Sequence, residues 1–376
     1  MKNASRARAQ LRPHGMIAAG CHHCKFLPTC GGIQPDQSLL DCFEILCCRK
    51  PDDCKFHCTK NNFYIDDMRE VKTYGFRDLE PLRQDRMFGL PRYIPVIQHG
   101  SSRVTDLSCG MVAINTHDVL KLKAGKLCSS VTDGRELRSK WKLNAKTQVI
   151  LCGTGDDPPL ERYYENRRRD NIPAILAGLG VTLAIGPNFS HILDVVRTDN
   201  MFNRRRQLMC LAELSAVGIN AVPHLNHAQQ GDWEYWADYL KYNSSVVYVA
   251  KEFQTGNRNK SQGETTLREI QRIQDKIGRA LHPILIGGAQ FTESAAIMFE
   301  NFSILDSNPF SKARARRLYF MRDSKLESNP LRDTTVGWRY EDPIDHVLAN
   351  NISEYSQAIS LRTEAARNRH ARQAAV

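Results

Sequence analysis

Eight short apolar runs, separated by longer amphipathic or charged segments, constrain the fold of this chain more than any other feature. They lie at residues 93–97, 111–114, 149–152, 181–185, 219–222, 246–250, 283–286 and 302–305. The segments between and after the later runs have the apolar spacing of helices, at residues 160–176, 200–217, 233–242, 265–280, 292–299 and 311–320. Apolar strands that alternate with helices indicate a parallel sheet covered by helices. Eight such strands predict an α/β fold of the closed (β/α)8 TIM-barrel type, with an open doubly wound sheet as the alternative.

The 376 residues divide into three expected parts. Residues 1–80 form a cysteine-rich module, residues 81–325 the barrel, and residues 326–376 a C-terminal extension with a polar, helical pattern at 342–372. A barrel of about 250 residues with appendages fits this length.

Eight of the 12 cysteines lie in one segment near the N-terminus: Cys21, Cys24, Cys30, Cys42, Cys47, Cys48, Cys54 and Cys58. The apolar stretch before them, residues 16–20, is too short for the core of a signal peptide, so we expect a cytoplasmic, reducing location. The CxxC spacing of Cys21 and Cys24 brings two thiolates to one tetrahedral ion. We therefore expect two zinc ions, or one zinc ion with some thiols left over. An iron–sulfur cluster or a disulfide framework is the alternative.

The formal charge of +11 predicts attraction to polyanions, nucleic acid above all. Arginines cluster on expected helices, and we predict phosphate contacts for four of them: Arg204, Arg205, Arg314 and Arg316. Structural salt bridges are the alternative for these clusters. The longest uncharged stretch, residues 171–190, contains prolines and glycines and reads as a helix end, a turn and a buried strand, so no membrane partner is expected.

Polar residues gather just after the expected strands, at the end of a barrel where chemistry takes place. We expect six of them to bind substrate: Asn188, His224, Glu252, Gln254, Gly287 and Gly288. Carboxylates on different strands, Asp156, Glu252 and Asp306, can supply a nucleophile and a general acid/base. The alternatives are that the aspartates cap helices and that His224 is a core histidine.

Three of these segments resemble motifs of the tRNA-guanine transglycosylase superfamily, and more closely its DNA-modifying branch from phages and genomic islands. Residues 301–314 are similar to the nucleophile motif, an Asp ending a strand with a Pro and basic residues after it. Residues 286–289 resemble the Gly-Gly strand that binds the base, and residues 252–256 the motif that contacts its exocyclic groups. Residues 186–190, together with Asn203 and Arg204, also resemble a family of phage and plasmid proteins of unknown function.

The resemblance implies exchange of guanine for a 7-deazaguanine base, in DNA rather than tRNA. Asp306 would attack C1′ and Asp156 would shuttle protons, with a homodimer or accessory proteins as further partners. The chain departs from the family in two ways: its cysteines precede the barrel, and the Asp-Ser-Gly-Gly motif of the second catalytic Asp is missing. A zinc-containing nucleic-acid-binding protein without catalysis, or a barrel enzyme acting on small nucleotides, remains as the alternative.

Overall fold

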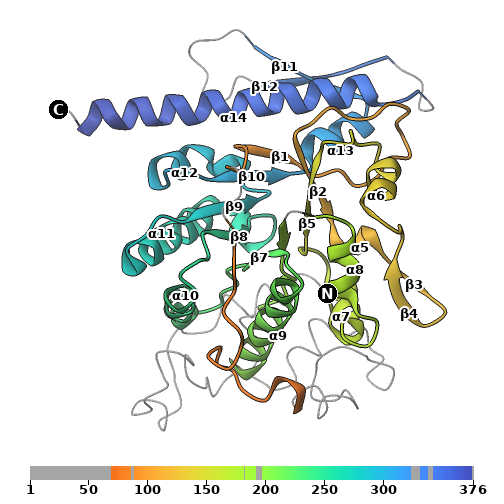
Figure 1. Cartoon of the computed structure of the whole chain (residues 1–376). Coiled ribbons are helices and arrows are strands. Elements are labelled where there is room, and N and C mark those ends of the chain that lie inside the picture. Colours follow the sequence, from red (N-terminus) through yellow and green to blue (C-terminus); the bar gives the residue numbers. More distant parts are fainter. Residues whose placement is uncertain are drawn as a thin grey trace, which may run out of the picture.

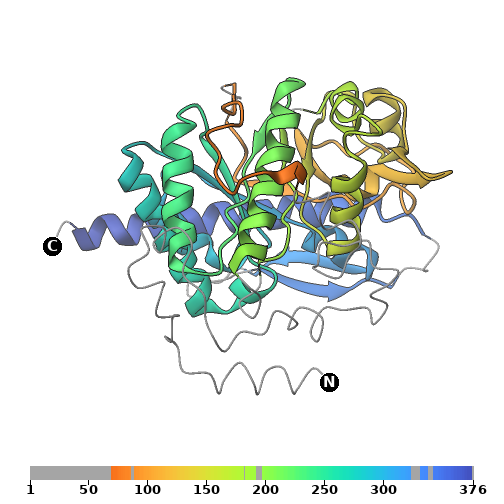
Figure 2. The ribbon, with the colours of Figure 1, turned by 90° about the horizontal axis from the view of Figure 1, so that it is seen from below.

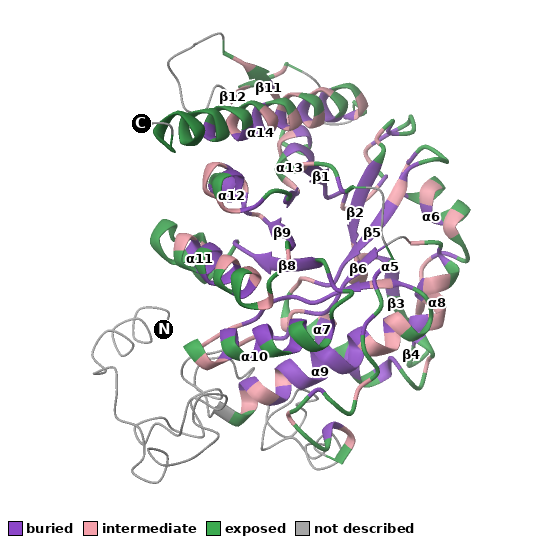
Figure 3. Ribbon diagram, turned by 60° about the vertical axis from the view of Figure 1, so that its left-hand side comes forward, coloured by how far each residue is buried: buried purple, intermediate pink, exposed green. Residues whose placement is uncertain are grey.

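The computed structural model describes residues 69–85, 89–181, 183–191, 197–322, 331–337 and 342–374. The strands of its parallel sheets occupy the centre and most of its helices lie outside them (Figure 1). The helices expose one side and bury the side that faces the strands (Figure 3). The fold is therefore mixed α/β with parallel sheets, as the alternation of apolar runs and helical segments predicts.

The strands form two parallel sheets of four, in the orders β1-β10-β9-β8 and β2-β5-β6-β7. The first sheet contains β1 (Tyr93–Pro95), β10 (Ser303–Asp306), β9 (His282–Ile286) and β8 (Tyr248–Glu252). The second contains β2 (Met111–Asn115), β5 (Gln148–Cys152), β6 (Leu183–Ile185) and β7 (Asn220–Val222). Each of the eight predicted runs overlaps one of these strands.

Isolated parallel bridges connect the two sheets at both of their edges. Val96, just after β1, pairs with Ala113 of β2, and His224, just after β7, pairs with Ala250 of β8. One cluster of buried apolar side chains draws at least one member from every one of the eight strands, including Ile94, Ala113, Ile150, Leu183, Val222, Ala250, Ile284 and Leu305. A second and larger cluster fills the space between strands and helices.

The helices that follow the strands are α7 (Asp157–Asn166), α8 (Ile172–Gly178), α9 (Arg197–Ala216), α10 (Gln230–Tyr242), α11 (Lys260–Ile277), α12 (Thr292–Met298) and α13 (Asn308–Arg314). Short 3-10 turns precede α11 and α12, namely η3 (Gly256–Arg258) and η4 (Ala289–Phe291). The ends of α11 follow from its sequence, since the Asn259 side chain caps the N-terminus and Gly278 takes the left-handed conformation at the C-terminus.

Two predicted helices were wrong in detail. The segment 160–176 contains parts of two helices, because Asn171 adopts a left-handed conformation with φ of 52° between them. The segment 311–320 leaves the helix at Arg314 and continues as strand β11 (Arg317–Met321), which pairs with β12 (Leu331–Thr335) in an antiparallel ribbon.

Four short elements between β2 and β5 were not predicted. They are α5 (Thr116–Val119), β3 (Leu120–Lys123), β4 (Lys126–Ser129) and α6 (Gly134–Lys140). Strands β3 and β4 form a hairpin of their own that projects beside α7 and α8 (Figure 1).

The predicted C-terminal helix is confirmed as α14 (Asp345–Ala374). It runs along β1, α12 and α13, so the C-terminal extension packs on the strand-and-helix core (Figure 2). Tyr355 of α14 stacks near Tyr93 of β1, with ring centroids 5.0 Å apart. Near the first of the described residues, Val71 is buried against Phe202 of α9. No helix among the described residues is long and apolar enough to cross a membrane.

Candidate active site at the carboxyl ends of the strands

The carboxyl ends of the strands carry a polar layer above the apolar interior. Side chains alternate between the two faces of a strand, so a residue two positions beyond an interior residue faces the interior as well. We call the cluster shared by all eight strands the interior cluster. Two positions beyond its members, the ends of four strands carry polar side chains: Asn115, Thr154, His224 and Glu252. His224 and Glu252 belong to the predicted site, whereas Asn115 and Thr154 were not predicted.

His224 is the most unusual member of this layer. Its side chain is 1% exposed, and neither ring nitrogen makes a hydrogen bond of normal geometry within the described residues, although Asn226 lies near enough to influence its pKa. Burial and then the charge of Lys251 hold the pKa of His224 well below its usual value. The ring is therefore neutral at pH 7, with one donor and one acceptor available to a ligand. Buried polar groups without partners are rare and mark candidate functional sites.

Other ionisable side chains surround His224. The charges of His191 and His227 each act on it, and His227 stacks on Trp233 with ring centroids 4.2 Å apart. Burial lowers the pKa of Lys251, which is 5% exposed at the end of β8, to about 8, so its amine is mostly charged at pH 7. Sequence reasoning missed Lys251, and the signal was a lysine directly following an apolar run.

Glu252 and Gln254 lie beside the glycines that follow β9, as expected for one binding region. Glu252 is 8% exposed, and its carboxylate accepts hydrogen bonds from the N–H groups of Gln254 and Thr255 and from the Thr255 hydroxyl. Gly287 has a positive φ of 68°, and a Cβ there would overlap the Gln254 side chain. Gly288 is also tightly enclosed. The backbone geometry therefore requires Gly287, and it allows Gln254 to pack on it.

The loops after β5 and β6 meet through Asn188 and Asp157. Asn188 accepts a hydrogen bond from the Gly155 N–H at 3.2 Å, and the Ser190 hydroxyl donates to Asp157 at 2.7 Å. Burial raises the pKa of the Asp157 carboxyl. Asp156, the predicted proton shuttle, is exposed and precedes α7 without capping it through its side chain. Its neighbour Asp157 has the environment that a general acid requires.

Asp306 ends β10 as predicted, but its side chain faces the helices. Its neighbour Leu305 belongs to the interior cluster, so alternation turns Asp306 outward. Its carboxylate accepts hydrogen bonds from the N–H of Asn308 at 2.7 Å and from the hydroxyl of Tyr355 at 3.0 Å. Burial raises its pKa, against the effect of these donors. The Asp306 carboxylate therefore binds the first N–H of α13 from the position before the N-cap residue Ser307, which is close to the helix-cap alternative. It does not support the expected nucleophile, which would face the interior.

The prediction that Arg204 and Arg205 contact phosphate is wrong, because both side chains are buried. Arg204 is 0% exposed, and its guanidinium pairs with Asp232 at 2.6 Å. Arg205 is 3% exposed and pairs with Asp78 at 2.6 Å. Both side chains connect α9 to neighbouring segments through ion pairs. Their carboxylate partners lie far away in sequence, so the local sequence could not predict them. The salt-bridge alternative holds for this cluster.

The second pair of predicted phosphate contacts lies at the end of α13. Arg314 is exposed, and its charge contributes to lowering the pKa of His99. Arg316 is half-buried and has a positive φ of 55°. Of the four arginines, Arg314 is therefore the one whose exposure suits a contact with phosphate.

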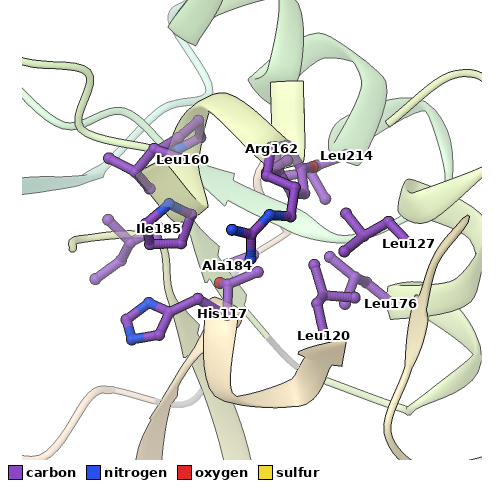
Figure 4. Close-up of a pocket in the computed structure, with 14 residues that line it drawn as sticks. His117, Leu120, Leu127, Leu160, Arg162, Leu176, Ala184, Ile185 and Leu214 are labelled. Carbon is purple, nitrogen blue, oxygen red and sulfur yellow. The ribbon is translucent and has the colours of Figure 1, made fainter. Parts of the chain in front are cut away.

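A pocket opens beside the ends of β5 and β6 (Figure 4). It contains about 580 Å³ of space, part of it open to solvent, and its walls are mainly apolar. Leu120 and Leu127 of the β3–β4 hairpin form one side, and His117 and Arg162 supply polar groups. The pocket was not predicted, because hairpin, helix and strand segments far apart in sequence build it.

The predicted metal ligands, Cys21 to Cys58, lie outside the described residues. Within the part of the chain that the structure describes, no group of three or more His, Cys, Asp or Glu side chains is placed to hold a metal ion. No protein-family model matches the sequence, and no curated protein matches it.

Proposed function

We propose that the eight strands form one closed (β/α)8 barrel and that the chain is an enzyme acting at its carboxyl-end mouth. The bridges between the two sheets and the interior cluster shared by all eight strands support closure. Active sites of such barrels lie at this end. The observation that carries the catalytic proposal is the buried, neutral ring of His224, whose nitrogens lack well-formed hydrogen bonds within the described residues.

The reaction we propose is exchange of guanine for a 7-deazaguanine base in nucleic acid, in DNA rather than tRNA. Its support is the sequence resemblance at residues 252–256 and 286–289, together with the packing of Gln254 on Gly287 at the ends of neighbouring strands.

The outward orientation of Asp306 changes the roles that the resemblance implies. In our scheme the inward-facing Glu252 carboxylate attacks C1′, the bond from C1′ to guanine N9 breaks, and guanine leaves with a proton from Asp157. The deazaguanine then attacks C1′ through its ring nitrogen and gives its N–H proton to Asp157, and the Glu252 carboxylate leaves. The raised pKa of Asp157 suits the acid in the first step.

The cysteine-rich module is proposed to hold zinc, and its eight thiols exceed the ligands of one tetrahedral site. A purely nucleic-acid-binding role loses part of its support, because the arginines at 204–206 are buried and paired with carboxylates.

An exchange assay with isotopically labelled guanine tests the proposed function. The zinc-loaded full chain should incorporate label into DNA, Glu252→Gln should lose incorporation, and Asp306→Asn should keep it. Failure of the wild-type chain to label either DNA or tRNA overturns base exchange. Loss of activity in Asp306→Asn with retention in Glu252→Gln, both with unchanged melting temperature, would return the nucleophile to Asp306 and overturn our assignment.

A further inference from the structure

The β3–β4 hairpin carries three lysines on one face. Its register places Lys121 opposite Cys128 and Lys123 directly opposite Lys126. Cross-strand partners project from the same face of a hairpin, and so do alternate residues of one strand. Lys121, Lys123 and Lys126 therefore share a face, and all three are exposed.

The hairpin is held in place by its other face and by its turn. Leu120 and Leu127 are buried and line the pocket of Figure 4. The turn residues Ala124 and Gly125 both have positive φ, 48° and 76°, as in the type I′ turn that matches the twist of a hairpin. The lysine face is thus presented by a preformed element.

The charges on this face are not balanced within the hairpin. Lys123 and Lys126 are like charges in directly opposed positions, which destabilises a strand pair. One carboxylate close to this face is Asp170, which accepts the Leu127 N–H at 2.7 Å and pairs with Arg169 at 2.9 Å. The hydrogen bond from Arg169 and then the charges of Arg169 and Lys126 act to lower the pKa of Asp170, so this carboxylate is shared between two cations. Arg169 also donates to the Gly125 carbonyl at 2.8 Å, so it adds a cation at the turn. A bound polyanion would relieve this repulsion.

We propose that the lysine face of the β3–β4 hairpin binds the phosphate backbone of the nucleic acid, an inference that rests on the proposed function. Lys121 and Lys123 are two residues apart on one strand, about 6.8 Å, a spacing comparable to that of successive phosphates along a nucleic-acid strand. The hairpin takes the role that the buried Arg204 and Arg205 cannot perform.

The test measures binding of a fluorescent DNA duplex to the full chain by anisotropy over a range of salt concentrations. The triple variant Lys121→Gln, Lys123→Gln and Lys126→Gln is compared with a control of equal charge change, Lys241→Gln, Lys260→Gln and Arg268→Gln, on exposed positions of α10 and α11. The hairpin variant should bind at least tenfold more weakly at low salt. Its log–log salt slope should fall by roughly 2 to 3, since each duplex phosphate contact contributes about 0.9. The control should retain the wild-type slope.

Several results would overturn the inference. One is an unchanged salt slope in the hairpin variant, and another is an equal loss of DNA affinity in the control variant. A third is absence of DNA binding by the wild-type chain. The fourth is that polyglutamate of matched charge displaces the labelled DNA as effectively as unlabelled DNA does. The exchange assay separates the two proposals. A chain that binds DNA through the hairpin but exchanges no base refutes the proposed function alone, and a hairpin variant with unchanged binding and exchange refutes this inference alone.

Discussion

Replacing Asp232 by Asn should strongly destabilise the fold, because it leaves a buried guanidinium without its counter-charge. Arg204 and Asp232 are both 0% exposed and their nitrogen and oxygen lie 2.6 Å apart. The Arg204 guanidinium also lies over the Tyr235 ring, 3.5 Å from its centroid, so it has no route to solvent. Breaking a buried pair by removing one partner costs about 3–5 kcal/mol of the free energy of unfolding.

A surface pair on the same helix provides the matched control. Glu234 of α10 pairs with Lys276 of α11, and the two side chains are 50% and 49% exposed. Exposed pairs contribute about 0–1 kcal/mol, so Glu234→Gln should change little. Urea titration followed by tryptophan fluorescence reports on both variants, because Trp233 and Trp236 are buried on α10. Equal midpoints for Asp232→Asn and Glu234→Gln would refute the buried pair and make Arg204 a candidate phosphate contact again.

Three further predictions concern the strand end, acid stability and metal content. Asp306→Asn should lower the melting temperature, because losing a carboxylate that binds a helix N-terminus costs about 1 kcal/mol of the free energy of unfolding. A variant with a normal melting temperature but no base exchange would contradict this prediction. Burial holds the pKa of His282 at about 4, below its value of 6.5 when unfolded, so only the unfolded state takes up the proton as pH falls from 6.5 towards 4. Stability should fall over that window by up to about 1.4 kcal/mol per pH unit, and urea midpoints at several pH values should fall less steeply for His282→Gln. Elemental analysis of the full chain should find about two zinc ions, and a chain without metal would refute the cysteine module.

The sequence was sufficient to locate the strands but not to orient the residues at their ends. Each strand is buried on both faces, so its apolar run lacks the alternation that identifies the inner face. Ile304 and Leu305 are both apolar, and nothing in the sequence distinguishes whether Asp306 points to the mouth or to the helices. The interior cluster, which depends on neighbouring strands, decides it.

Long-range partners explain the other differences. In the sequence, the arginines at 204–206 have the pattern of an exposed basic patch. In the structure they form ion pairs with Asp232, Asp78 and Glu161, which come from distant segments. Likewise, β11 becomes a strand because β12, which lies further along the chain, pairs with it. In both cases the local pattern agrees with two structures, and only the tertiary arrangement selects one.

The central claim is that this chain exchanges bases in nucleic acid at the mouth of its barrel, and nucleoside mass spectrometry tests it most directly. DNA and tRNA are digested from host cells that carry the wild-type gene, the Glu252→Gln variant or neither. Our account predicts a 7-deazaguanine deoxynucleoside in DNA from the wild-type cells alone. A wild-type protein that accumulates in the cell and leaves both DNA and tRNA without a modified guanosine would contradict it.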